Sequence, residues 1–348
     1  MSHSLNQLVG QLIIAGFRGT QANYNSDIAR YIHDFNLGGI ILYDEDIEIG
    51  GRGTRNISSQ DQIWELTQQL QSYSDDGLLV AIDQEGGSVT RLKPDYGFPK
   101  LHSWHHIGIL DNLLITEQFA LSISDTLKVC GINLNLAPVL DLNYGAKTII
   151  GKSKRALSED PKKVIEHARI FINELKKNNI ISCGKHFPGQ GSAFGDTHEG
   201  ITDISKTWNI ADLQPYSELN QSGDLDMVMV AHVFNKKMDH KFPASLSKDI
   251  INNVFRKNLG FRGVVMCDDP SMKAISDNYN LEQTFELMLN AGIDLFCLGN
   301  NLRYDKNYIS KSVLALSNLV ETNKISENRI YESIYRVNAL KDKFNINK

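Results

Sequence analysis

The amino-acid sequence predicts an α/β fold and, within that class, a (β/α)8 barrel of the TIM type. Two observations predict it. Short apolar runs recur eight times between residues 8 and 300, and stretches with the apolar spacing of helices lie between them. The runs are nearly continuous in Val, Ile, Leu and Met instead of alternating with polar residues, as expected for parallel strands that are covered on both faces.

The eight predicted strands are residues 11–17, 38–43, 78–83, 132–138, 180–187, 226–233, 263–269 and 292–299. Helical spacing is clearest in residues 60–73, 161–178, 246–259 and 281–291. A helix is expected to start near Pro161, because a polar cap followed by proline in the first turn is typical of helix N-termini. A doubly wound open sheet is the alternative fold, but no G-x-G-x-x-G motif follows the first strand.

We expect one domain that covers all 348 residues. The barrel is predicted to span about residues 8–300, and residues 301–348 are predicted to form terminal helices. The apolar positions of these helices are Val313, Leu316, Leu319, Ile325, Ile330 and Ile334. No linker rich in Pro or Ser interrupts the chain. The main irregular insertion is the loop of residues 44–59, and the sequence does not show whether it contacts a ligand.

Composition and charge narrow the function classes. The hydrophobic content of 41% and the charged content of 22% are ordinary for a soluble globular protein. The formal net charge is −5 and no long basic run occurs, so neither nucleic acid nor a membrane is expected as a partner. No apolar run reaches the ~20 residues that span a bilayer. The N-terminus also lacks the features of a signal peptide, so we expect a cytoplasmic protein.

The four cysteines lie far apart in the sequence, and three of them fall in apolar, strand-like runs. We therefore expect buried free thiols in a reducing compartment rather than disulfides or a metal site. They are Cys130, Cys183, Cys267 and Cys297.

Charged side chains collect where the predicted strands end. Active sites of such barrels form at the C-terminal ends of the strands, so five strand ends of this kind predict convergence on one pocket. The residues concerned are Asp83 with Arg91 beyond it, Arg155, Lys185 with His186, His232, and Asp268 with Asp269.

The glycine-rich segment after the fifth strand adds Asp196 and His198. A histidine can give and take a proton near neutral pH, and an aspartate two residues away can fix its tautomer. The structural alternatives are an Asx-turn for Asp196 and a solvated loop position for His198. Asp268 or Asp269 supplies a carboxylate that can attack an activated carbon, and strand alternation does not choose between the two.

Residues 185–191 (KHFPGQG), followed by Asp196-Thr-His198, resemble the signature of the family 3 glycoside hydrolases. The resemblance is closest to bacterial β-N-acetylglucosaminidases (β-hexosaminidases) of the NagZ type, which recycle cell-wall fragments. It covers about residues 8–300. Further matching segments, in the expected order, are residues 82–87, 131–141, 155–161, 231–232, 243–247, 259–265 and 267–269.

This resemblance implies a retaining glycosidase that works through a covalent glycosyl-enzyme intermediate. Asp268 matches the nucleophile, His198 the acid/base and Asp196 its partner. The positions that match residues holding the sugar are Asp83, Arg91, Arg155, Lys185, His186 and His232. The implied substrate is a terminal β-linked N-acetylglucosamine, expected on a peptidoglycan-derived muropeptide. No cofactor and no metal are implied, and a monomer or weak homo-oligomer is expected.

Four positions depart from the family pattern without removing a proposed catalytic group. Gln190 replaces a second histidine, Ser88 an arginine, Leu157 an aromatic residue, and Pro270 a leucine or methionine. These departures concern the geometry of the glycine-rich loop, the direction of the Asp268–Asp269 pair and the substrate preference.

Other functions remain open from the sequence alone. A phosphorylase or β-glucosidase of the same family would share the site, and phosphate-stimulated formation of a sugar 1-phosphate would identify the phosphorylase. A metal-dependent barrel hydrolase would use His186, His232 and Asp268 as ligands and would lose activity with a chelator. A non-catalytic sugar-binding barrel would bind without turnover. The sequence determines neither the aglycone nor the oligomeric state.

Overall fold

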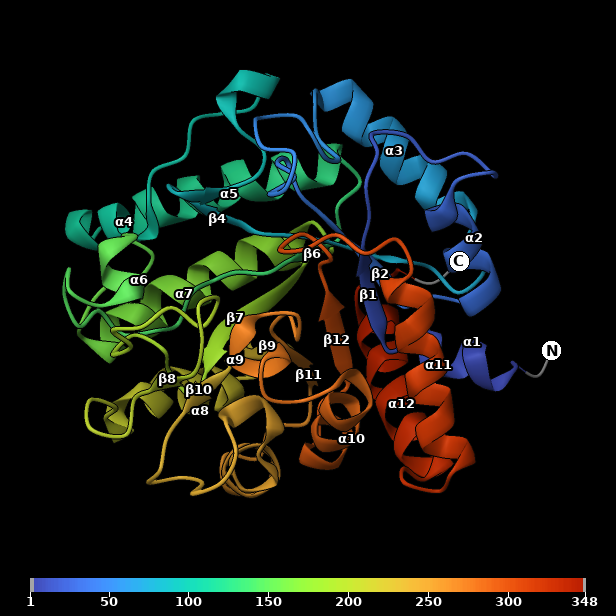
Figure 1. Cartoon of the computed structure of the whole chain (residues 1–348). Coiled ribbons are helices and arrows are strands. Elements are labelled where there is room, and N and C mark those ends of the chain that lie inside the picture. The colour runs from blue at the N-terminus through green and yellow to red at the C-terminus, as the bar shows by residue number, and fades with distance from the viewer. Residues whose placement is uncertain (1–2, 347–348) are drawn as a thin grey trace.

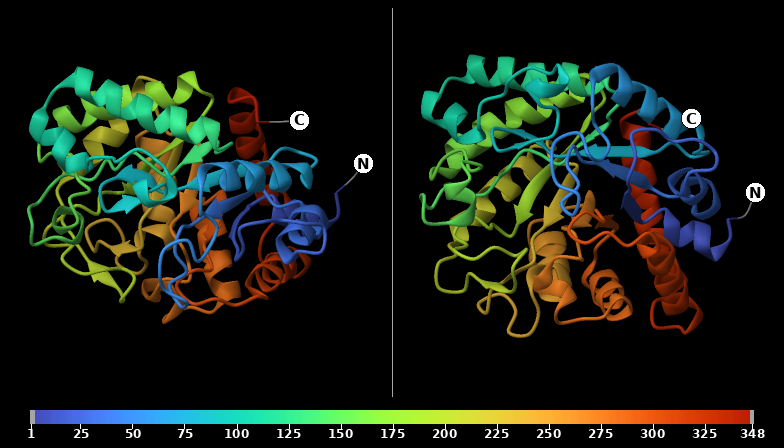
Figure 2. Two further views of the ribbon diagram at one scale, coloured as in Figure 1. Left: turned by 90° about the horizontal axis from the view of Figure 1, so that it is seen from above. Right: turned by 45° about the horizontal axis from the view of Figure 1, so that its top comes forward.

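The structure, a computed structural model, describes residues 3–346. Eight parallel strands close into a barrel in the order β1-β12-β11-β9-β7-β6-β3-β2, with helices around it (Figures 1 and 2). The predicted (β/α)8 barrel is confirmed. The open-sheet alternative is wrong, because β1 pairs with both β12 and β2 and leaves no free edge.

Each barrel strand lies within one of the eight predicted runs. The strands are β1 (Ile13–Gly16), β2 (Gly39–Leu42), β3 (Leu79–Ile82), β6 (Leu134–Asn135), β7 (Ile181–Phe187), β9 (Met227–Val230), β11 (Val264–Cys267) and β12 (Leu295–Leu298). They are fully buried, which explains why the runs are continuously apolar: the lumen covers one face and the helices cover the other.

A helix follows every barrel strand. These helices are α2 (Asp27–Phe35), α3 (Gln60–Ser72), α5 (Leu113–Val129), α7 (Pro161–Lys177), α8 (Gln214–Gln221), the π-type helix η4 (Asp249–Asn258), α10 (Leu281–Ala291) and α11 (Tyr308–Glu321). The predicted start of α7 is confirmed, since the side chain of Asp160 accepts a hydrogen bond from the backbone N–H of Lys162 at 2.9 Å. The predicted helix 246–259 is shorter at its start, because a separate 3-10 turn, η3 (Ala244–Leu246), precedes η4.

Small elements that the sequence did not predict lie in the loops after the strands. Two short sheets form there, an antiparallel pair of β4 (Gln84–Gly86) with β5 (Val89–Thr90) and a parallel pair of β8 (Thr202–Asp203) with β10 (Val233–Phe234). The loops also hold η1 (Pro94–Tyr96), α4 (Trp104–Leu110), α6 (Ile149–Lys152), η2 (Ile210–Leu213) and α9 (Lys273–Ser276). These elements therefore shape the end of the barrel where a site is expected.

The N-terminal end of the barrel is closed by the last helix, α12 (Glu327–Lys343), and α1 (Leu5–Gly10) packs against α11 and α12 (Figure 1). Val337, Leu340 and Phe344 belong to the apolar cluster that fills the lumen. The six apolar positions predicted for the terminal helices are all buried. The four cysteines are free and buried, as predicted.

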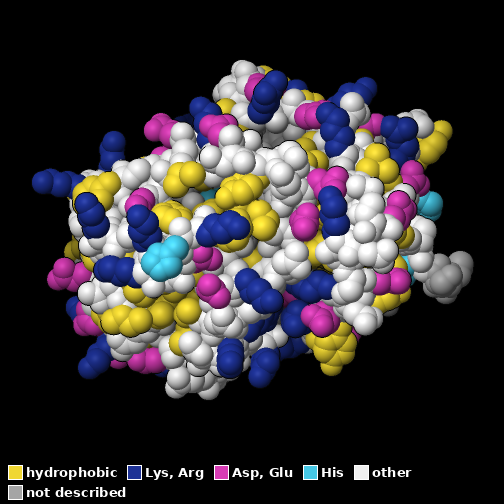
Figure 3. Space-filling model, turned by 60° about the horizontal axis from the view of Figure 1, so that its bottom comes forward, with side chains coloured by type: hydrophobic (Ala, Val, Ile, Leu, Met, Phe, Trp, Pro, Cys, Tyr) yellow, Lys and Arg dark blue, Asp and Glu magenta, His cyan; other side chains and the backbone are white. Residues whose placement is uncertain are grey.

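Basic, acidic and apolar side chains are interspersed over much of the face seen in Figure 3, and several Lys and Arg side chains gather below its centre. Within residues 3–346, no helix combines the length and the apolar character that crossing a membrane requires.

Two glycines allow a close approach at the C-terminal ends of β1 and β12. A Cβ atom on Gly16 would lie 1.8 Å from the backbone oxygen of Gly299. A Cβ atom on Gly299 would lie 2.4 Å from the hydroxyl of Tyr43 and 2.7 Å from Oδ2 of Asp269. The missing side chain of Gly16 thus lets β1 approach the backbone of Gly299, and that of Gly299 leaves the space that Tyr43 and Asp269 occupy.

We predict that Gly16→Ala lowers the free energy of unfolding by ~1–3 kcal/mol, the range for side chains forced into a packed core. Urea denaturation measures the loss. Gly195→Ala is the control, because its Cβ would meet only the Thr202 side chain, at 3.0 Å. It should cost no more than ~0.5 kcal/mol. Equal losses in the two variants would contradict the close-approach explanation.

Candidate active site

A cavity of about 270 Å³ opens at the C-terminal end of the barrel. Its floor is apolar and is formed by side chains that also belong to the lumen core, namely Ile41, Leu136, Met229 and Cys297. The cavity therefore ends blindly on the packed barrel. Seven of the nine predicted site residues line it: Asp83, Arg91, Arg155, Lys185, His186, His198 and Asp268.

Alternating charges form one connected group on the wall of the cavity. The Nζ atom of Lys185 lies 2.8 Å from Oδ1 of Asp83 and 2.6 Å from Oε1 of Glu85. Arg155 forms a bidentate pair with Glu85, with N–O distances of 2.7 and 2.8 Å. Arg91 reaches Asp83 at 3.5 Å. Each buried charge thus has an opposite charge beside it, as burial requires.

The cations decide the ionisation of the two carboxyls. Burial acts to raise the pKa of both, but Lys185, Arg155 and Arg91 outweigh it. The pKa of Glu85 falls to about 2, and that of Asp83 lies well below its usual range. Burial also acts to lower the pKa of Lys185, yet the two carboxylates raise it above its usual value. All three groups therefore stay charged at neutral pH.

A bulge at the end of β7 places two consecutive side chains in the cavity. Successive residues of a regular strand point to opposite faces. The register between β7 and β9 shifts between Lys185 and Phe187, however, and both Lys185 and His186 line the cavity. A bulge re-aims a side chain in this way.

The protonation of His186 follows from its partners. Nη2 of Arg155 lies 3.2 Å from Nε2 of His186, and a guanidinium can only donate, so Nε2 accepts and carries no proton. Nδ1 then carries the proton and donates it to Oδ2 of Asp141 at 2.7 Å. The ring is held as one neutral tautomer between a cation and a buried carboxylate.

The two carboxylates after β11 differ in their surroundings. The oxygens of Asp269 accept hydrogen bonds from the backbone N–H groups of Ser271 (2.9 Å) and Gly299 (3.1 Å), and burial raises the pKa of this carboxyl to about 6. Oδ1 of Asp268 accepts from the N–H of Asp269 at 2.8 Å. Within residues 3–346, Oδ2 of Asp268 receives no hydrogen bond. Of the pair, Asp268 therefore has the oxygen available to a ligand.

His198 lies at the cavity on the loop between β7 and β8, with its side chain 54% exposed. Nδ1 of its ring lies 2.7 Å from Oδ1 of Asp196, which also accepts the backbone N–H of His198 at 2.9 Å. Partial burial acts to raise the pKa of Asp196, but these two hydrogen bonds lower it. Asp196 thus forms the Asx-turn and also orients the ring, and it does not line the cavity itself.

His232 is not brought into the cavity. Its side chain is fully buried beside the cavity wall, where Nε2 lies 3.1 Å from the backbone oxygen of Asp269 and Nδ1 lies 2.7 Å from Oγ of Ser245. Burial lowers the pKa of this histidine, so the neutral ring donates from Nε2 and accepts at Nδ1. In this structure His232 contacts the backbone of the Asp268–Asp269 pair and does not line the cavity, and its role in holding the sugar stays a prediction.

Several residues at the site were not predicted from the sequence, and three of them contact or lie beside the predicted groups. Glu85 pairs with the cations, Asp141 holds His186, and the ring of Tyr43 lines the cavity after β2. The spacing of Asp83 and Glu85 was a usable signal, because residues two apart on an extended chain share a face. Tyr43 is the last residue of the predicted strand 38–43, and Asp141 lies three positions after the predicted strand 132–138, but nothing in the local pattern marks either as a site residue.

Two of the four departures lie close to these groups. The backbone N–H of Gln190 donates to Oδ1 of Asp141 at 2.6 Å, a bond that any residue except proline would make. Pro270 follows Asp269 and lines a neighbouring surface cavity rather than this one. Ser88 donates to the backbone oxygen of Ser153, and Leu157 is buried in the core.

No metal-binding arrangement is present in the part of the chain that the structure describes. Among residues 3–346, no group of three or more His, Cys, Asp and Glu side chains is placed to hold a metal ion. His186 and His232, two of the ligands considered from the sequence, each have both ring nitrogens within hydrogen-bond distance of other protein atoms.

Known families and proteins show the same fold and similar sequences. The model of the glycosyl hydrolase family 3 N-terminal domain matches residues 4–340. A β-hexosaminidase of Psychromonas ingrahamii is 32% identical over 315 residues, which are 88% of this chain and 86% of that protein. A β-hexosaminidase of Haemophilus influenzae is 34% identical over 71% of each chain.

Solved structures extend the likeness to the whole barrel. A family 3 β-N-acetylglucosaminidase from Paenibacillus sp. superimposes with a TM-score of 0.89 and 31% identity over 99% of this chain. The match spans only 63% of the Paenibacillus chain. A β-N-acetylhexosaminidase from Beutenbergia cavernae gives a TM-score of 0.86 with 26% identity over 98% of this chain and 99% of its own.

We predict that Glu85→Gln lowers the free energy of unfolding at pH 7 by ~3 kcal/mol, because it leaves buried cations without their partner. A carboxyl whose pKa is lowered by folding stabilises the folded state at every pH above the pKa that it has in the unfolded chain. This stabilisation is lost as the pH falls toward the pKa of the folded state. The difference in the free energy of unfolding between wild type and Glu85→Gln should therefore be largest above about pH 4.5, and it should shrink as the pH falls toward 2. Denaturant unfolding from pH 3 to 8 measures it.

The control is Glu65→Gln, an exposed position on α3. It should change stability by less than ~0.5 kcal/mol at every pH. A Glu85→Gln deficit that does not depend on pH would show that the charge of Glu85 is not what stabilises the site.

Proposed function

Because the chain belongs to glycoside hydrolase family 3 and is a glycosidase, we propose that it removes terminal β-linked N-acetylglucosamine with retention of configuration. The observation that carries the proposal is the free oxygen of Asp268 in a blind cavity that also holds His198. The relatives named β-hexosaminidase and the Paenibacillus β-N-acetylglucosaminidase support the choice of sugar. We propose the barrel as the catalytic unit.

The blind floor favours exo action. The cavity ends on the packed lumen, so a sugar that fills it has no continuation beyond the floor. Ring hydroxyls need both acceptors and donors on the wall. Asp83 supplies acceptor oxygens, while Arg91, Arg155 and Lys185 supply donors, and their mutual ion pairs keep them in place before a sugar enters.

In the proposed reaction, Asp268 attacks the anomeric carbon as the leaving group departs. His198 donates a proton from Nε2 to the glycosidic oxygen, and a covalent glycosyl-Asp268 intermediate forms. His198 then takes a proton from water, which attacks the same carbon and releases the carboxylate. Asp196 would hold Nδ1–H throughout, leaving Nε2 as the nitrogen that exchanges the proton.

Asp268 is the proposed nucleophile rather than Asp269. Attack needs an ionised oxygen that can reach the sugar. Both oxygens of Asp269 are occupied by backbone N–H groups, and burial favours its protonated form. We propose a peptidoglycan-derived muropeptide as the natural substrate, on the strength of the family resemblance. A cytoplasmic location and a monomer or weak homo-oligomer also remain predictions.

We predict that the wild-type protein releases nitrophenol from p-nitrophenyl N-acetyl-β-D-glucosaminide in preference to the β-glucoside. Asp268→Ala should lower kcat by ~10⁴-fold or more, the scale for loss of a covalent nucleophile. Asp277→Ala, an exposed residue outside the cavity, should leave the rate unchanged. NMR of the first product should show the β-anomer, and an α-anomer would exclude retention. Sugar 1-phosphate formed with added phosphate would identify a phosphorylase instead.

We predict that His198→Ala lowers kcat/KM by ~10²–10⁴-fold on a disaccharide substrate, the usual contribution of a general acid. The loss should be much smaller for the p-nitrophenyl glycoside, because nitrophenolate leaves without protonation. The neighbouring exposed Glu199→Ala serves as control. Losses of equal size on both substrates would assign His198 to binding or loop structure rather than to proton transfer.

A further inference from the structure

The loop of residues 44–59, between β2 and α3, contributes directly to the cavity. Glu45 and Ile47 line it from this loop, and Asn301 and Leu302 line it from the loop after β12. The two loops come from neighbouring positions of the barrel order, separated only by β1. They form one side of the cavity.

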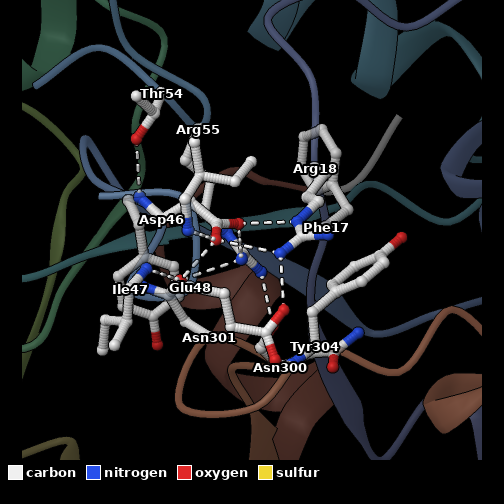
Figure 4. Close-up of polar contacts among 12 residues, drawn as sticks. Phe17, Arg18, Asp46, Ile47, Glu48, Thr54, Arg55, Asn300, Asn301 and Tyr304 are labelled. Carbon is white, nitrogen blue, oxygen red and sulfur yellow. Dashed lines mark hydrogen bonds and ion pairs between the residues drawn. The ribbon is translucent and has the colours of Figure 1, made fainter. Parts of the chain in front are cut away.

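A buried guanidinium holds the loop against the end of β12. The Arg55 side chain is fully buried, and its Nη1 donates to Oδ2 of Asp46 and to Oδ1 of Asn301, both at 2.8 Å. Its Nη2 donates to the backbone oxygens of Gly299 at 3.1 Å and Asn300 at 2.8 Å. One side chain thus joins both loops (Figure 4).

A second arginine completes the connection from the end of β1. Arg18 forms a bidentate pair with Asp46 at 2.7 and 2.9 Å and reaches Glu48 at 2.9 Å. Its guanidinium lies over the ring of Tyr304, 3.8 Å from the centroid (Figure 4). The hydrogen bond from Arg18 leads the effects that lower the pKa of Asp46 to about 2, outweighing its burial. These ion pairs therefore persist through neutral and mildly acidic pH.

Ile47 lies between the residues that Arg55 and Arg18 hold, and its side chain is exposed. Its backbone N–H donates to Oδ1 of Asn301 at 3.3 Å, and Nδ2 of Asn301 donates to the backbone oxygen of Glu45 at 3.0 Å. The Ile47 side chain is nevertheless 58% exposed. A single exposed apolar side chain is common on protein surfaces, but Ile47 also lines the cavity and its backbone is fixed, so a ligand in the cavity can cover it.

We propose that Ile47, together with Leu302, contacts the leaving-group side of the substrate, so that this loop sets the aglycone preference. This inference rests on the proposed function. The charged wall and the floor hold the terminal sugar, so the exposed rim meets the group on the far side of the glycosidic oxygen. Two aliphatic side chains fit an aglycone that presents an apolar face, such as an aryl ring or the C–H face of a second sugar ring.

The loop provides its own control. Ile49 is equally exposed, at 60%, and lies on the same loop, but it does not line the cavity. Ile47→Ala and Ile49→Ala therefore remove the same number of carbon atoms from equally exposed positions. Neither side chain takes part in the proposed chemistry.

The experiment compares kcat/KM for wild type and both variants on three glycosides of N-acetyl-β-D-glucosamine: the p-nitrophenyl glycoside, the N-acetylglucosaminyl disaccharide and the methyl glycoside. For Ile47→Ala, kcat/KM should fall about 3- to 10-fold on the p-nitrophenyl glycoside and on the disaccharide. This is the scale for removing partly buried methyl and methylene contacts. The variant should change kcat/KM for the methyl glycoside by less than about 2-fold, because this aglycone is too small to span the rim. Ile49→Ala should leave all three unchanged.

Equal losses on all three substrates, equal losses in the two variants, or no loss would each overturn the proposal. If the wild type cleaves none of the glycosides, the proposed function fails separately. The aglycone contact is then tested by equilibrium binding of the disaccharide and of free N-acetylglucosamine. Ile47→Ala should reduce the preference for the disaccharide about 3- to 10-fold, and an unchanged preference overturns it.

Discussion

The mutual compensation of buried charges above the lumen is the interaction on which the site depends. Lys185 lies on β7 and Arg155 on the loop after β6, while Asp83 and Glu85 follow β3, the next strand in the barrel order. None of these groups would be tolerated alone at this depth, because desolvating a single charge costs several kcal/mol. Since each stabilises the others, hydrogen-bonding groups for a sugar stand ready without any rearrangement.

The same arrangement depends on apolar packing and on missing side chains. The apolar side chains of the lumen core form the floor of the cavity. Met229 and Cys297 belong to both, so their positions limit the depth of the cavity. Gly299 leaves room for Tyr43 and Asp269, whose carboxyl in turn accepts the N–H of Gly299. His232 holds the backbone of Asp269 from behind. The Asp268–Asp269 pair is thus held by contacts with Val230 at the end of β9, His232 beyond it and Gly299 after β12.

Periodicity in the sequence was enough to predict the barrel, because fully buried parallel strands and the helices between them leave distinct patterns. Location at strand ends was enough to predict that Asp83, Arg91, Arg155, Lys185, His186 and Asp268 meet at one cavity, but it missed their partners Glu85 and Asp141. The choice of Asp268 over Asp269 needed the resemblance to a family, since alternation on an apolar strand leaves both open. The sequence could not show partners that only the closed fold brings together, such as Asp141 with His186 or Arg55 with Asn301.

Other local features depend on the closed fold in the same way. His232 follows a predicted strand, as the predicted sugar-binding residues do. Its ring is nevertheless buried behind the backbone of Asp269, where it hydrogen-bonds Ser245, which is thirteen positions away in the sequence. The bulge that brings Lys185 and His186 to one side is a property of the pairing between β7 and β9 rather than of either segment.

The closure of the lumen by α12 has a consequence for how the protein forms during synthesis. Val337, Leu340 and Phe344 fill the N-terminal end of a core whose other members are spread from β1 to β12. Asp294, buried just before β12, takes Arg336 of the same helix as a partner. A nascent chain that has left the ribosome only as far as β12 exposes an unfilled apolar core and an under-compensated carboxylate. This end of the core is therefore filled only after α12 has emerged, and until then the apolar strands stay exposed to intermolecular contacts.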